Sequence, residues 1–201
     1  MIFDVAEMTI PKAYEKPDTS HLYRLFFDVE GSLTYKGDLI QLAYILTHWD
    51  FTVVETFSKY YRNLTPITDE EFNVHKLSTE FLWKNADHHF SLELPNLDIY
   101  RRKNMMFISY TDFDMRKINE QCTQYGVERF DFGPKANSLK TLPKKVNNFD
   151  AYSIKGRSLQ QSATKEQKSE AGSMTNGNAH DAFYDTYLMY VLCRDYYKEM
   201  P

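Results

Sequence analysis

The sequence contains little cysteine, glycine or proline, and no long apolar run. Its 201 residues include 2 cysteines, 7 glycines and 7 prolines, which excludes disulfide-rich scaffolds, collagen-like repeats and low-complexity architecture. Its longest apolar runs, such as residues 105–108, are far too short to span a bilayer. Asp4 and Glu7 interrupt the region where a secretory signal peptide needs an apolar core. We therefore expect a protein of the reducing cytoplasm that does not contact a membrane.

The sequence also has no excess of positive charge. Its net charge is −4, and 42% hydrophobic residues with 26% charged residues form an ordinary globular balance. This length suits a single domain with one sizeable core. Any contact with nucleic acid must then come from a local basic patch. Aromatic residues, by contrast, are abundant, with 15 Tyr and 14 Phe; they serve as core residues, as stacking platforms for bases, or as both.

The first half of the chain predicts an antiparallel sheet. Residues 1–21 carry Pro11 and Pro17 and show no clear element, so we interpret them as an extension that precedes a domain over residues 22–201. Three segments with strong β-propensity follow at short spacing, at residues 22–29, 39–46 and 51–60. This order predicts an antiparallel meander.

The second half alternates between helix and strand. The helix predictions rest on Thr68 and Ser78 as N-caps and on Gly126 as a helix stop, and they cover residues 69–75, 78–85, 112–125 and 180–197. Short apolar strands are predicted over residues 105–110 and 127–132. Residues 133–156 read as irregular, and the polar stretch 160–179 is expected to be a flexible loop. A mixed α/β sheet in a single domain follows from this order.

Several carboxylates occupy positions where a core residue is expected. Asp28 and Glu30 end an apolar strand, and their spacing of two residues places them on one face. Asp185 lies in the inward phase of the last helix, where it must be paired, neutralised or bound to a cation. An ion pair with Arg24 or another basic residue is the structural alternative. Asp114 lies in the first turn of its helix, where the helix dipole alone also favours an acid.

These four carboxylates, if they converge, form an oxygen-rich site for hard divalent cations. Such a ligand set suits Mg²⁺ or Mn²⁺ rather than zinc. Two such ions ~4 Å apart clamp the attacking and leaving oxygens of an in-line phosphoryl displacement.

Three segments carry a resemblance to a known family. They read FFDVEGS (residues 26–32), SYTDFDM (109–115) and HDAFYD (180–185), and they resemble the three exonuclease motifs of the DEDDh superfamily. That superfamily includes polymerase proofreading subunits, ribonuclease T and oligoribonuclease. The resemblance covers residues 22–198 and implies a ribonuclease H-like fold, in which a mixed five-stranded sheet is flanked by helices on both faces.

The resemblance also implies roles for individual residues. The implied metal ligands, which would hold two Mg²⁺ or Mn²⁺ ions, are Asp28, Glu30, Asp114 and Asp185. His180 would be the general base, with Glu30 as the other catalytic residue; the alternative for His180 is a loop residue before a helix capped by Asp181. Ser32 and Leu77 match nucleotide-contacting positions, Leu77 as an apolar wedge within VHKLSTE (74–80). Asp112 competes with Asp114 as the third ligand, but the Phe-Asp pair at the helix start favours Asp114.

The function implied is a metal-dependent 3′→5′ exonuclease that binds a nucleic-acid 3′ end and releases nucleoside 5′-monophosphates. The alternative is a nucleic-acid-binding, proofreading or trimming subunit of a larger complex, in which a partner supplies substrate and specificity; a homo-oligomer is also consistent with the sequence. The family often has His-Asn at Ser109-Tyr110 and Thr-Thr-Gly at Gly31-Ser32-Leu33. These departures retain the metal ligands and leave open the choice between DNA and RNA and between single and double strands.

Overall fold

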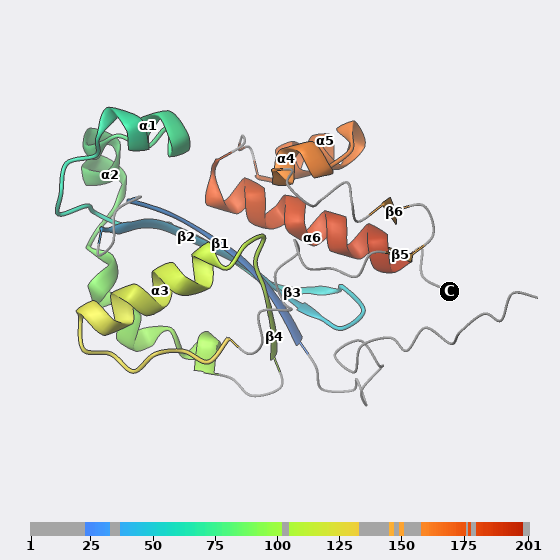
Figure 1. The fold of residues 1–201 in the computed structure, drawn as a ribbon, viewed down its shortest axis with the longest axis horizontal. Helices are drawn as coiled ribbons and strands as arrows, with labels where there is room; N and C mark the ends of the chain where they lie inside the picture. Colours follow the sequence, from blue (N-terminus) through green and yellow to red (C-terminus); the bar gives the residue numbers. More distant parts are fainter. Residues whose placement is uncertain are drawn as a thin grey trace, which may run out of the picture.

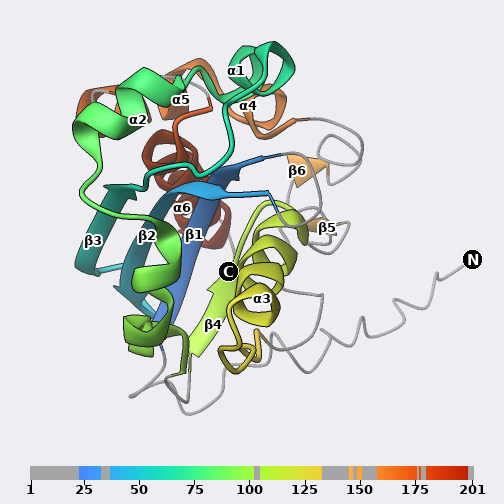
Figure 2. The ribbon, with the colours of Figure 1, turned by 90° about the vertical axis from the view of Figure 1, so that its left-hand side faces the viewer.

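A four-stranded mixed sheet forms the centre of the protein. The computed structural model describes residues 23–32, 37–101, 105–132, 145–146, 149–150, 158–175, 177 and 180–198. The strands are β1 (Tyr23–Gly31), β2 (Leu39–His48), β3 (Val53–Tyr60) and β4 (Met105–Ile108), in the spatial order β3-β2-β1-β4 (Figures 1 and 2). β1, β2 and β3 pair antiparallel, and β4 is parallel to β1. The predicted meander is therefore confirmed. The predicted extension, residues 1–21, lies outside the described residues.

Helices cover both faces of this sheet. They are α1 (Asp69–His75), α2 (Thr79–Asn85), α3 (Phe113–Gln124), α4 (Leu159–Ser162), α5 (Lys165–Thr175) and α6 (Ala182–Lys198). Three short 3₁₀ helices, η3 (Phe90–Leu92), η4 (Leu94–Asn96) and η5 (Asp98–Arg101), lead from α2 to β4. Figure 1 shows α3 on one side of the sheet and α6, with α4 and α5, on the other. None of the described helices is both long and apolar enough to cross a membrane.

Local sequence signals fix several helix ends. Thr68 and Glu71 form a reciprocal capping box at the start of α1, and Ser78 caps α2. Gly126 adopts a φ of 68° directly after α3, a conformation that glycine enters without steric cost. The predicted boundaries of these helices are accordingly close to those observed.

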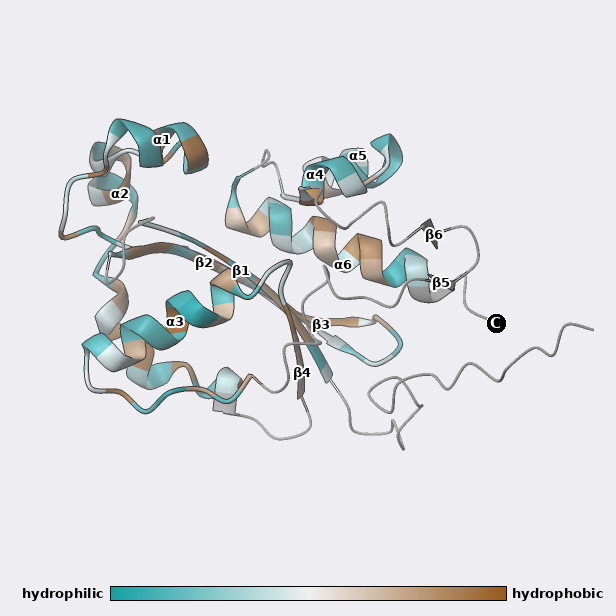
Figure 3. Ribbon diagram, in the orientation of Figure 1, coloured by the Kyte–Doolittle hydropathy of each residue, from teal (hydrophilic) through white to brown (hydrophobic). Residues whose placement is uncertain are grey.

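The side chains of β1 alternate between two hydrophobic clusters, one on each face of the sheet. Leu25 and Phe27 pack in one cluster with Ile118 of α3. Phe26 packs in the other with Leu188 of α6. The hydrophobic residues in Figure 3 accordingly concentrate in the central strands, whereas α5 is mostly hydrophilic. Much of the aromatic content is core, in which stacked and edge-to-face pairs such as Phe27–Tyr100 form.

The prediction of a strand over residues 127–132 is wrong, so the described sheet has four strands rather than five. The side chain of Asn119 replaces the strand partner: its Oδ1 accepts from the Phe130 N–H (2.8 Å) and its Nδ2 donates to the Phe130 carbonyl (3.1 Å). Phe130 and Phe132 are nevertheless buried. An apolar segment can thus enter the core without joining the sheet when a side-chain amide satisfies its backbone.

The loop expected over residues 160–179 is instead largely helical, because α4 and α5 occupy most of it. Ser158 and Gln161 form a capping box at α4, and Ala171 of α5 is fully buried. The Arg194 guanidinium of α6 holds Glu170 of α5 through two bonds of 2.6 and 2.9 Å. Most residues of α5 are also good helix formers, so the polar composition of this segment does not by itself indicate a loop. The mobility of the segment remains a prediction.

Most of the segment predicted as irregular, residues 133–156, lies outside the described residues. Within it the structure describes a short antiparallel ribbon, β5 (Lys145–Val146) paired with β6 (Phe149–Asp150).

Candidate active site

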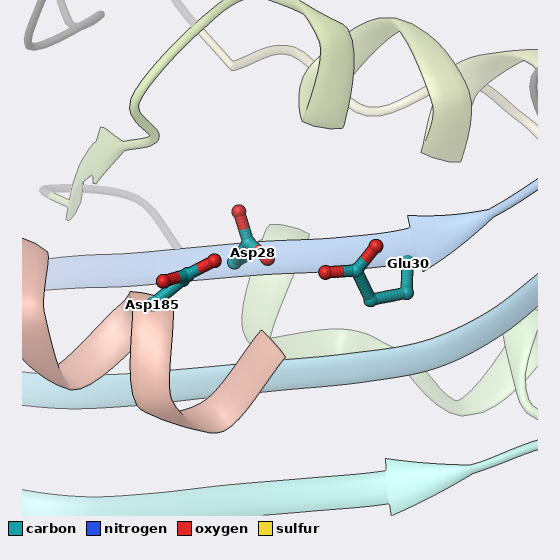
Figure 4. A group of neighbouring side chains, drawn as sticks. All are labelled: Asp28, Glu30 and Asp185. Atoms are coloured by element: carbon teal, nitrogen blue, oxygen red, sulfur yellow. The ribbon is translucent and has the colours of Figure 1, made fainter. Parts of the chain in front are cut away.

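Three of the predicted carboxylates meet at the junction of β1 and α6. Asp28 and Glu30 have the same strand parity as Phe26 and therefore face α6, and Asp185 lies in the first turn of that helix. Carboxylate oxygens of these three residues all lie within 4.8 Å of one another. Figure 4 shows the Glu30 and Asp185 side chains approaching Asp28 from opposite sides.

Asp114 borders this group from the start of α3. It is 3% exposed, its Oδ1 accepts from the Val29 backbone N–H (3.2 Å), and it shares a side-chain hydrogen bond with Asp28. It is not one of the three carboxylates within 4.8 Å of one another. Its rival Asp112 is exposed at the N-cap of α3. The structure thus places Asp114, and not Asp112, beside the cluster.

Asp185 accepts hydrogen bonds from neutral groups. Gln160 Nε2 donates to its Oδ1 (2.6 Å), and the His180 backbone N–H donates to its Oδ2 (3.1 Å). The alternative was an ion pair with Arg24. The Arg24 guanidinium instead lies 3.7 Å from the centre of the Trp49 ring and donates to the Trp49 carbonyl. The described hydrogen bonds of Asp185 therefore come from neutral donors, and the charge of the neighbouring His180 also favours the ionised carboxylate.

Burial raises the pKa of every carboxylate in the cluster. The pKa of Asp114 rises to about 7 and that of Asp185 to about 6. Burial, and then repulsion from neighbouring carboxylates, holds the pKa values of Asp28 and Glu30 well above their usual range. A group of carboxylates that resists ionisation in this way is stabilised when a cation binds, and oxygen-only donors suit Mg²⁺ or Mn²⁺. The residues present therefore fit a divalent cation.

His180 precedes α6 in a left-handed backbone conformation. Its φ is 67° and its side chain is exposed, while its backbone N–H donates to Asp185. Asp181 is indeed the helix cap, since its Oδ1 accepts from the backbone N–H groups of Phe183 and Tyr184. His180 is thus joined to the cluster through its backbone. Its role as a base remains a prediction.

The two predicted nucleotide-contacting residues are buried beside β1 and α1. The Ser32 hydroxyl donates to Glu71, and buried Lys117 donates to the Ser32 carbonyl (2.9 Å). Leu77 is 8% exposed and packs with Ile40 and Leu82. The hydroxyl of Ser32 and the side chain of Leu77 both have partners within the protein. Their contacts with a nucleotide remain predictions.

The sequence interpretation missed two side chains that hold the start of α6. Gln41 Nε2 and the Tyr60 hydroxyl donate to Asp181 Oδ2 (3.2 and 3.0 Å), and Gln41 Oε1 accepts from the Ala182 N–H (3.1 Å). Gln41 is fully buried in the mostly apolar strand β2. A lone amide in an apolar strand is a signal for such a contact, because a buried amide must find partners. Gln160 lies in a polar stretch of the sequence, where one more amide does not indicate a buried contact.

Comparison with known proteins shows the fold. Neither a protein-family profile nor any curated protein sequence matches the chain. The structure is similar to that of E. coli exonuclease I in complex with a dA16 oligonucleotide, with a TM-score of 0.62 and 14% identity. It is also similar to the nuclease domain of 3′hExo, a DEDDh family member, bound to rAMP, with a TM-score of 0.61 and 15% identity. The chain has the fold of the DEDDh exonucleases.

The extent of the match differs between these structures. The match covers 87% of this chain and 40% of exonuclease I, so the chain spans about two fifths of that protein. It covers 90% of this chain and 94% of the 3′hExo domain. A 3′-exonuclease from a structure of 3′-end-specific recognition of a histone mRNA stem-loop gives a TM-score of 0.62 at 13% identity, over 88% of this chain and 81% of that one. The DEDDh fold thus accounts for nearly all of the chain, and it confirms the ribonuclease H-like α/β class expected from the sequence.

Proposed function

We propose that the chain is a metal-dependent 3′→5′ exonuclease that hydrolyses nucleic acid to nucleoside 5′-monophosphates. One observation carries this proposal: three carboxylates from β1 and α6 lie within 4.8 Å of one another, with Asp114 beside Asp28, in a DEDDh fold. Buried acids without a basic partner are costly to fold. We therefore expect this cluster to bind cations that act on the scissile phosphate.

The carboxylates form two overlapping ligand sets in this proposal, and the two sets share Asp28. Asp28, Glu30 and Asp185 would hold one Mg²⁺ or Mn²⁺ ion, since their oxygens already lie together. Asp28 with Asp114 would hold a second, because these two side chains lie next to each other. When bound, the ions would stabilise the negative charge that develops on the scissile phosphate.

His180 would take the proton from the attacking water. Neutral imidazole is available near pH 7, which suits a general base. The exposed side chain of His180 is accessible from solvent, and its backbone bond to Asp185 keeps the residue at the edge of the cluster. Asp181, fixed by Gln41 and Tyr60, would set the position of this residue at the start of α6.

The substrate would be a nucleic-acid strand with a free 3′ end. Similar structures hold a DNA oligonucleotide in one case and a ribonucleoside monophosphate in another, so both DNA and RNA belong in the test. Leu77 would press against the terminal base. Ser32 would contact the same nucleotide by exchanging one of its present partners, which include Glu71 for its hydroxyl and Lys117 for its carbonyl.

The proposal is tested with 5′-labelled DNA and RNA oligonucleotides in Mg²⁺, Mn²⁺ or EDTA. We expect a ladder that shortens from the 3′ end and disappears in EDTA. Asp114→Asn should abolish it, whereas the matched variant Asp112→Asn, which changes an exposed acid two residues earlier, should retain it. Activity that persists in excess EDTA, or equal loss in both variants, would contradict the proposed site.

A further inference from the structure

The α4–α5 segment brings a side-chain amide into the carboxylate cluster. Gln160 Nε2 lies 2.6 Å from Asp185 Oδ1. This distance is slightly shorter than that of an ordinary N–H···O hydrogen bond. The second oxygen of Asp185 accepts from the His180 N–H at 3.1 Å. Each oxygen of the carboxylate therefore has its own donor.

The position of Gln160 is set by contacts that do not involve its own amide. Next to it, Leu159 is buried, and Ser162 lies within hydrogen-bond distance (3.3 Å) of the Tyr110 hydroxyl. Further along, Glu170 of α5 is bound by Arg194 of α6. The segment is thus anchored to the same helix that carries Asp185, and the Gln160 amide approaches the carboxylate from an anchored backbone.

The two donors have different consequences for a ligand that must hold a cation. Both donors together fix the plane of the Asp185 carboxylate, and Figure 4 shows this carboxylate directed toward Asp28. With the His180 N–H alone, the carboxylate is free to rotate about its last side-chain bond. Groups that hydrogen-bond to a metal ligand typically change metal affinity or activity by about 10- to 100-fold when removed.

We propose that Gln160 is a positioning residue that orients Asp185 for cation binding, so that the α4–α5 segment supports the metal centre. This inference rests on the proposed function, because it takes Asp185 as a metal ligand. Gln160 itself touches neither the cation nor the substrate in this account. Its contribution lies in the geometry of the carboxylate.

The test is calorimetric titration of Mn²⁺ into the full chain without nucleic acid. Gln160→Leu removes the amide and should weaken Mn²⁺ binding by about 10- to 100-fold. Gln160→Asn keeps the amide but shortens its reach, and it should weaken binding as well, which covers the case in which the leucine variant fails to fold. Gln124→Leu makes the same change at an exposed site on α3, where the amide contacts the Tyr125 hydroxyl, and should bind Mn²⁺ like the wild type.

The outcomes separate the two proposals. If the wild type binds Mn²⁺ and both Gln160 variants bind it as tightly or more tightly, the inference is overturned and the exonuclease proposal stands. Tighter binding by the variants would mean that the amide competes with the cation. No Mn²⁺ binding by the wild type, together with no metal-dependent cleavage, would overturn both.

Discussion

Replacing Asp185 by Asn should stabilise the metal-free protein, although it removes a residue that we place in the active site. The pKa of Asp185 rises from 3.8 to about 6 in the folded protein, chiefly through burial. A raised acid pKa adds stability below about pH 4, which is lost as the pH rises through about 6. At pH 7.5 the ionised group therefore destabilises the metal-free fold by about 3 kcal/mol at most.

The asparagine variant loses part of this gain. Gln160 and His180 donate to different oxygens of Asp185, and an amide offers only one acceptor oxygen. One donor is left without its partner, at a cost of about 1–2 kcal/mol. The net expected gain at pH 7.5 is about 1–2 kcal/mol, or about 2–8 °C in melting temperature for a chain of this size.

Thermal melts in EDTA at pH 7.5 and pH 5 measure this effect. The stabilisation should be smaller at pH 5, where Asp185 is already largely protonated. Asp195→Asn is the matched control on the same helix: its carboxylate pairs with Arg194 (2.9 Å), so removing its charge should not raise the melting temperature. If Asp185→Asn melts several degrees below the wild type at pH 7.5, Asp185 is a structural residue and the reasoning fails.

Three further predictions follow from the same structure. Mn²⁺ should raise the wild-type melting temperature more at pH 7.5 than at pH 5, because protons compete for carboxylates whose pKa values reach about 6 and about 7; an equal shift at both values would argue against binding at this cluster. His180→Ala should lower the cleavage rate by about 10²- to 10⁴-fold with little change in Mn²⁺ affinity; near-full turnover would leave His180 as a loop residue. Asn119→Leu should lower the free energy of unfolding in urea by about 2–4 kcal/mol, since the Phe130 N–H and carbonyl lose their partners; unchanged stability would refute the explanation given for the missing strand.

The elements that follow from local chemistry could be predicted from the sequence. Thr68 with Glu71, and Gly126, act within a few residues of themselves, and the structure shows the same caps and stop. The strand parity of Asp28 and Glu30 and the helical phase of Asp185 also require only short-range geometry. These patterns place each carboxylate on an inward face, whereas the resemblance to the DEDDh superfamily is what implies that they converge on one site.

The remaining features depend on partners far apart in the chain. Asn119 replaces a strand partner for Phe130, and Arg194 of α6 anchors α5 through Glu170. The Gln160–Asp185 contact spans 25 residues and the Gln41–Asp181 contact spans 140. No periodicity or capping rule reports on such pairs, so a single sequence predicts the carboxylates but not the amides and hydroxyls that position them.

The central claim is hydrolysis from the 3′ end. The most direct test measures the hydrolysis of one labelled oligonucleotide in the presence of Mn²⁺, with a bulky group blocking either its 3′ end or its 5′ end. The account predicts that the 5′-blocked strand is hydrolysed like the free strand and that the 3′-blocked strand resists. It also predicts that Asp114→Asn abolishes hydrolysis of the free and the 5′-blocked strands. Equal hydrolysis of the two blocked strands by the wild type would contradict it.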